Sequence, residues 1–193
     1  MTVYGYEYFG RPYVYGEAPG PSAGVPSAGA PLSGIRRRLG KLIGVSEDEM
    51  AELFVWKNLL DEWPGYGPGG GSKFPASAAR HRARFELARF RPLTLTTNRP
   101  FIYLGKRVAK AFDFDGEWLV WSHDQAVCPH PSGLNRWWND SEHVEQARAF
   151  WENAAIKADH WLASPSVTQM RSRAPKMSQN EPPAHATTSG SPR

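Results

Sequence analysis

The chain has 193 residues with 23 Lys and Arg against 19 Asp and Glu, which is the size of one domain. Its formal net charge of +4 permits a nucleic-acid partner without requiring one. Its single cysteine, Cys128, excludes an internal disulfide framework and a four-cysteine zinc or iron–sulfur site within one chain, and no apolar run reaches the ~20 residues that span a bilayer, so we expect a protein of the cytosol, or of the nucleoid if bacterial.

The N-terminal part predicts two short strands and a long loop. Aromatic residues alternate along residues 1–10, which favours a short edge strand, and residues 11–15 have the pattern of a second strand. The second strand runs directly into residues 16–20, which must be a turn because their glycines and proline end the strand. It presents Glu17 at the carboxyl end of a strand, where open α/β sheets bind their ligands. Residues 21–34, rich in Pro, Gly, Ser and Ala, predict a loop that wraps this position.

Two helix signals come next. Ser33 is the expected N-cap of an amphipathic helix that ends at Gly44. Ser46 and Glu49 have the spacing of a capping box, which predicts a short helix through Leu53.

The middle of the chain alternates strands with helices. Residues 54–60 predict a strand and residues 75–90 a helix. Residues 100–104 then form a buried type of strand, and residues 106–112 form a short helix after the tight turn at Gly105. This order of elements is typical of a mainly parallel sheet covered by helices.

The C-terminal part completes the expected domain. Residues 117–121 and 125–128 predict two more strands, and a helix is expected from Asn139 or Ser141 to about residue 162. Beyond it the composition is poor in large apolar residues, which predicts a disordered tail at 164–193. The sequence therefore indicates one α/β domain over residues 1–163, with a mainly parallel sheet.

The segment from Cys128 to Trp138 has features for which a packed core has no use. Two prolines fix the backbone on either side of His130, and a serine and a glycine follow at once. Such a segment holds an imidazole rigidly at a strand end while the chain turns. Leu134 and Arg136 follow, and an apolar side chain beside a cation is suited to entering a base stack while gripping a phosphate.

Two motifs resemble those of the uracil-DNA glycosylase superfamily. Gly-Glu-Ala-Pro-Gly at 16–20 is similar to its first motif, and His-Pro-Ser-Gly-Leu-Asn-Arg at 130–136 to its second. Their order, separation and strand context also match, over roughly residues 11–162. The resemblance implies a three-layer αβα domain with a small, mainly parallel four-stranded sheet. It also implies a DNA glycosylase of base excision repair, which hydrolyses the N-glycosidic bond of uracil or a related deaminated base.

The resemblance also assigns roles to individual side chains. Glu17 would orient a water and stabilise the oxocarbenium-like sugar cation, and His130 would donate a hydrogen bond to the departing base. Asn58 would read the flipped base, because a carboxamide offers a donor and an acceptor to an imide edge. Ala18 and Leu32 would also contact the base. Contacts to DNA would come from Ser132, Gly133, Leu134, Asn135 and Arg136, with Leu134 filling the gap in the stack.

Three features leave the subfamily and the damaged base open. The first motif is closest to the iron–sulfur members, but one cysteine cannot hold their cluster. Leu32 stands where those members have a phenylalanine that stacks on uracil. The second motif combines the histidine of uracil-specific enzymes with the Pro-Ser-Gly-Leu of mismatch-type enzymes.

We therefore expect a monomeric, monofunctional glycosylase that acts on single- or double-stranded uracil-containing DNA and needs no metal or organic cofactor. A catalytically inactive DNA-binding protein of the same fold is one alternative. An unrelated nucleotide-binding α/β protein that shares the two loops by chance is another.

Overall fold

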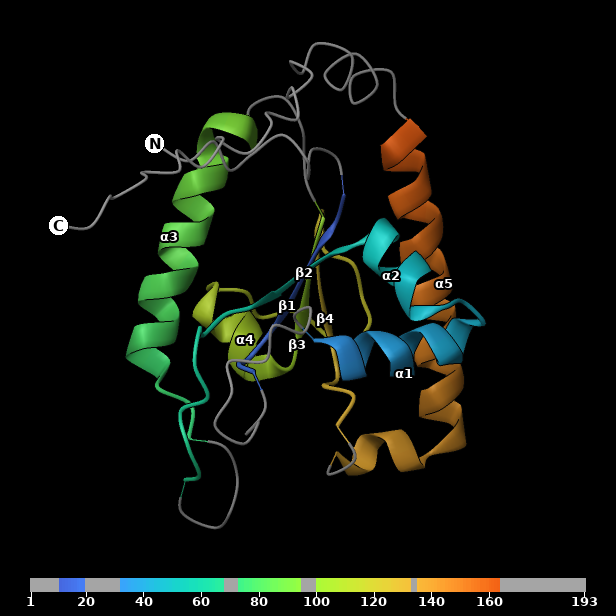
Figure 1. Cartoon of the computed structure of the whole chain (residues 1–193), viewed down its shortest axis with the longest axis horizontal. Coiled ribbons are helices and arrows are strands. Elements are labelled where there is room, and N and C mark those ends of the chain that lie inside the picture. Colours follow the sequence, from blue (N-terminus) through green and yellow to red (C-terminus); the bar gives the residue numbers. More distant parts are fainter. Residues whose placement is uncertain (1–10, 20–31, 68–72, 95–99, 133–134, 164–193) are drawn as a thin grey trace, which may run out of the picture.

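The structure is a computed structural model that describes residues 11–19, 32–67, 73–94, 100–132 and 135–163. Its centre is a four-stranded sheet with helices on both faces (Figure 1). The strands are β1 (Tyr13–Gly16), β2 (Val55–Asn58), β3 (Phe101–Leu104) and β4 (Gln125–Cys128). The helices are α1 (Ser33–Ile43), α2 (Glu47–Leu53), α3 (Ala76–Thr94), α4 (Lys106–Ala111), the 3₁₀ helix η2 (Arg136–Asn139) and α5 (Ser141–Ala163).

All neighbouring strands of the sheet are parallel, in the order β2-β1-β3-β4. In the register, Tyr13 of β1 lies opposite Val55 of β2 and Phe101 of β3. The predicted α/β class and four-stranded parallel sheet are confirmed. Because all strands run in one direction, their carboxyl ends lie along one edge of the sheet, and the loops after β1, β3 and β4 leave from that edge.

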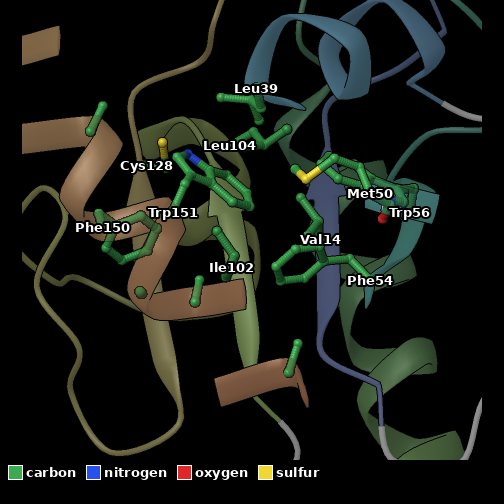
Figure 2. Close-up of a cluster of buried hydrophobic side chains, with 14 of the residues drawn as sticks. Val14, Leu39, Met50, Phe54, Trp56, Ile102, Leu104, Cys128, Phe150 and Trp151 are labelled. Atoms are coloured by element: carbon green, nitrogen blue, oxygen red, sulfur yellow. The ribbon is translucent and has the colours of Figure 1, made fainter. Parts of the chain in front are cut away.

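One face of the sheet packs against α1, α2 and α5. Figure 2 shows the inward side chains of this layer, among which Trp151 of α5 lies in ring contact with Phe54 and Trp56 at centroid distances of 5.6 and 6.1 Å. Val14 and Ile102 contribute from the two central strands. The alternation of side chains along each strand puts every second residue into this layer.

The opposite face packs against α3 and α4 through a second apolar cluster that includes Tyr15, Tyr103 and Phe112. This cluster also contains a buried carboxylate, Glu86 of α3. The Tyr15 hydroxyl donates a hydrogen bond to Glu86 at 3.0 Å, and Lys57 Nζ lies 2.9 Å from the same carboxylate oxygen. The buried charge is therefore neutralised and hydrogen-bonded, as burial requires. Burial, followed by the charge of Glu86, raises the pKa of Tyr15 well above its usual value.

Helix starts agree with the sequence at α2 and differ at α1. Ser46 Oγ accepts from Glu49 N at 3.1 Å and Ser46 N donates to the Glu49 carboxylate at 2.7 Å, so the predicted capping box is confirmed. Gly44 ends α1 in a left-handed conformation, as predicted. Ser33, however, is the first residue of α1 and not its N-cap. Leu32 takes the cap position with a φ of 61° and no side-chain cap bond.

The strand predicted at residues 117–121 is wrong. The segment contains only an isolated bridge from Trp118 to Val127, and Leu119 has a φ of 63°. An extended strand cannot continue through that left-handed residue. The other strands that were predicted within the described residues are present, although β2 spans Val55–Asn58 instead of residues 54–60.

Several predictions fall outside the described residues. They concern the edge strand at 1–10, most of the loop at 21–34 and the tail at 164–193. In the described part of the chain, no helix combines the length and apolar character needed to cross a bilayer.

Two glycines of α1 offer a test of how closely this layer is packed. A Cβ at Gly40 would lie 2.7 Å from the backbone oxygen of Val45, whereas a Cβ at Gly34 would meet nothing within 4 Å. We expect Gly40→Ala to lower the free energy of unfolding by about 1–3 kcal/mol, because backbone must move. Gly34→Ala should raise it by roughly 0.5–1 kcal/mol through helix propensity. Urea denaturation of both variants measures this, and equal effects would contradict the packing of α1.

Candidate functional site

The candidate site lies at the carboxyl edge of the sheet, where the strand order reverses. From β1 the chain goes to β2 on one side and later returns to β3 on the other, and ligands of open α/β sheets bind at such a switch point. The segment after β1 is tied to the segment after β2. The carbonyl oxygens of Gly16 and Glu17 accept from the backbone N–H groups of Leu59 and Leu60, both at 2.9 Å. The backbone that carries Glu17 is therefore fixed by hydrogen bonds to the segment after β2.

The carboxylate of Glu17 forms a bidentate ion pair with the guanidinium of Arg107. Arg107 Nε lies 2.9 Å from Oε1, and the terminal nitrogen Nη2 lies 3.1 Å from Oε2. Arg107 is the second residue of α4, the helix that follows β3. The two charges therefore come from the loops of two neighbouring strands, on either side of the switch point.

The backbone around His130 is held by several donors. The carbonyl oxygen of His130 accepts from Asn135 Nδ2 and from Trp138 Nε1, each at 3.0 Å, and from Ser132 N at 2.8 Å. A guanidinium nitrogen of Arg38 in α1 donates to Pro131 O at 3.1 Å. The predicted rigidity of this turn thus has a physical basis, with an indole, an amide and an arginine fixing the backbone. Trp138 is buried and serves as a loop anchor.

The imidazole of His130 is mostly buried, and desolvation by burial lowers its pKa below the usual value. The charge of Glu17 acts in the opposite direction and raises the pKa, while the charge of Arg107 lowers it. Both charged groups therefore lie close enough to the imidazole to shift its titration. The lowered pKa favours the neutral imidazole, in which one ring nitrogen can still donate a hydrogen bond.

Asn58 carries an unsatisfied acceptor. It is the last residue of β2 and lies opposite Gly16 in the register. Its side-chain oxygen Oδ1 is buried and has no hydrogen-bond partner among the described residues. A buried acceptor that stays unpaired usually costs about 1–3 kcal/mol, and this one lies on the strand next to the one that Glu17 follows.

Leu32 lies against the start of the first motif. A Cβ at Gly16 would come within 2.7 Å of Leu32 Cδ2, so the leucine methyl groups occupy the space above the glycine. A side chain at residue 16 would therefore require the Leu32 side chain to shift. Ala18, the neighbour of Glu17, is half-buried.

The residues predicted to contact DNA differ in what the structure shows of them. Gly133 and Leu134 lie outside the described residues. The Asn135 side chain is engaged within the loop, since its Oδ1 also accepts from Trp137 N at 3.2 Å. Ser132 is half-buried, and Arg136 is exposed at the start of η2.

Sequence reasoning missed Arg107 and Phe74. The Arg107 guanidinium lies 5.4 Å from the centre of the Phe74 ring, which comes from the segment before α3. Neither residue belongs to a motif, and Arg107 is 90 positions from Glu17. The one available signal was the position of Arg107 directly after a strand and a glycine turn, where the other site residues also lie.

No group of three or more His, Cys, Asp or Glu side chains suited to a metal ion occurs among the described residues. Burial raises the pKa of the Cys128 thiol to about 12, with a smaller opposing effect from Trp151, so this cysteine is an inert core residue at neutral pH. Comparisons of the chain with protein-family models, curated proteins and solved structures found no match.

The opposing charges around His130 give a prediction with a definite sign. Glu17→Gln removes the negative charge that raises the pKa, so the pKa of His130 should fall further. Arg107→Gln removes the positive charge that lowers it, so the pKa should rise. NMR titration of the imidazole carbon–proton signal measures both shifts. Lys110→Gln, which removes one exposed charge elsewhere on α4, is the control, and equal shifts in all three variants would contradict the arrangement.

Proposed function

We propose that this protein is a DNA glycosylase that hydrolyses the N-glycosidic bond of uracil or a related deaminated base. The observation that supports the proposal is the position of three side chains at the carboxyl ends of parallel strands. Glu17 follows β1, Asn58 ends β2 and His130 follows β4. They offer a carboxylate, an amide and an imidazole along the edge of the sheet that contains the topological switch point, and these groups suit cleavage of a bond between a sugar and a base.

The electrostatics suit the two charges that develop as the bond breaks. Positive charge grows on the sugar, where a carboxylate such as Glu17 stabilises it and can orient the attacking water. Negative charge grows on the departing base, where a neutral imidazole can donate a hydrogen bond through its one N–H group. The lowered pKa of His130 favours that form at neutral pH.

The buried oxygen of Asn58 suits a base with an imide N–H. Uracil carries such a donor, whereas cytosine has an unprotonated ring nitrogen at that position. A flipped uracil would therefore satisfy the orphan acceptor, and cytosine would leave it unpaired. A site that relies on one hydrogen bond in this way can discriminate strongly between the two bases.

The surface of the chain suits a DNA partner. Arg136 is exposed beside the His130 turn, and the net charge is positive. We assign the domain to a uracil-DNA glycosylase-like fold on the two loop motifs at 16–20 and 130–136 together with the parallel four-stranded sheet.

A catalytically inactive DNA-binding protein of the same fold is the second candidate. Leu32 favours it, because its methyl groups pack onto Gly16 where an aromatic ring would stack on the base. A leucine offers weaker stacking than an aromatic ring.

The catalytic roles predict specific losses. Glu17→Gln and His130→Ala should each slow single-turnover release of uracil by roughly 10²–10³-fold, because each removes one preorganised electrostatic contact. DNA affinity at fixed salt should stay nearly unchanged. The measurement is abasic-site formation on single-stranded, mismatched and fully paired uracil oligonucleotides.

Two outcomes would decide against the proposal. Wild-type rates in both variants would overturn the assigned roles. Binding of all three substrates without release of any deaminated base by the wild-type protein would make the inactive binder the better account.

Asn58 supplies a separate test of base reading. Asn58→Ala removes a buried acceptor that has no partner in the described structure, so the melting temperature should stay the same or rise slightly. Excision of uracil should nevertheless fall by at least roughly 10-fold, because the imide contact is lost. Thermal denaturation measures the melting temperature, and single-turnover assays measure the excision rate. A large fall in stability would show that the Asn58 amide has a structural role.

A further inference from the structure

The ion pair between Glu17 and Arg107 has a geometry that fixes orientation. Its two contacts, at 2.9 and 3.1 Å, engage both carboxylate oxygens with two nitrogens of one guanidinium. A planar fork of this kind sets the plane of the carboxylate as well as its distance. A carboxylate has about four acceptor positions and the fork takes two, so the fork alone does not prevent Glu17 from accepting from a water.

Arg107 is itself held in place. Its guanidinium lies against the Phe74 ring, and its helix is anchored by Val108 and Ala109, which are fully buried. The turn before the helix is tied to β4, because Gly105 N donates to Cys128 O at 2.8 Å. The arginine therefore reaches Glu17 from a rigid base.

The contribution of this pair to stability should be small. The Arg107 side chain is 50% exposed and that of Glu17 is 19% exposed, and ion pairs exposed to this extent typically add little to the stability of a fold. The fork is thus better explained by what it does for the carboxylate than by what it does for the fold. Catalytic groups lose activity steeply when their geometry relaxes.

We infer that Arg107 is a positioning residue that holds the Glu17 carboxylate in the orientation needed to face the sugar and its attacking water. This inference rests on the proposed glycosylase function. It adds a residue of α4 to the site, which the sequence motifs identify only through the loops at 16–20 and 130–136.

The first test compares three variants of the full chain. Arg107→Ala should lower the single-turnover excision rate by roughly 10- to 100-fold at saturating enzyme, with DNA affinity within about twofold of the wild type. Arg107→Lys keeps the charge and loses the fork, so its rate should stay close to that of Arg107→Ala. Lys110→Ala removes an exposed charge from the same helix and should excise at the wild-type rate.

Chemical rescue separates positioning from a structural role. Millimolar guanidinium ion should raise the rate of Arg107→Ala several-fold, because it can occupy the vacated position and form the same two contacts. It should not raise the rate of Lys110→Ala or of the Glu17→Gln, Arg107→Ala double variant. A wild-type rate for Arg107→Lys, absence of rescue, or a loss confined to DNA affinity would each overturn the inference.

A readout independent of activity keeps the two proposals distinguishable. The Arg107 Nε–H should give an NMR signal that exchanges slowly in the wild-type protein and is lost in Glu17→Gln. If the wild-type protein releases no base while this signal is protected, the proposed function fails, but the ion pair between Arg107 and Glu17 is supported. If base is released while the signal is unprotected, the function stands and Arg107 does not hold Glu17.

Discussion

The parallel pairing of β1 with both of its neighbours is the constraint on which the site depends. β1 lies between β2 and β3, and its residues Tyr13 to Gly16 are buried. Parallel strands all end at the same edge of the sheet, so the segments that follow β1, β3 and β4 lie along that edge. No sequence motif has to link these segments to one another. The apolar layers on the two faces of the sheet hold that edge in register.

The chemistry of the edge follows from unequal burial. The His130 imidazole is mostly buried, and this burial lowers its pKa, whereas the Glu17 and Arg107 side chains are 19% and 50% exposed. The carboxylate and the arginine act on the imidazole in opposite directions, so the proton affinity of His130 depends on both. The fold thus places a carboxylate close enough to the imidazole to influence its pKa, and the proposed reaction needs both groups.

Local signals in the sequence were sufficient for much of the fold. The capping box at Ser46 and Glu49 and the stop at Gly44 depend on interactions within one turn, so their residues alone predict them. The prediction of a strand at 117–121 was wrong for a local reason too. Leu119 adopts a left-handed backbone conformation, and the spacing of apolar residues does not indicate such a conformation. The cap at Leu32 was missed because its side chain packs on Gly16, a contact made only in the folded chain.

The sequence by itself determined the α/β class, the strands that end at the site and the candidate pair Glu17 and His130, because strand ends, prolines and glycines act on their own neighbours. Only the tertiary structure decided that Arg107 forms an ion pair with Glu17 and that the buried Asn58 oxygen has no hydrogen-bond partner in the part of the chain that the structure describes. Arg107 and Glu17 are 90 residues apart. Their meeting depends on β1 and β3 lying side by side, and that adjacency arises from burial of the whole sheet, which no single motif encodes.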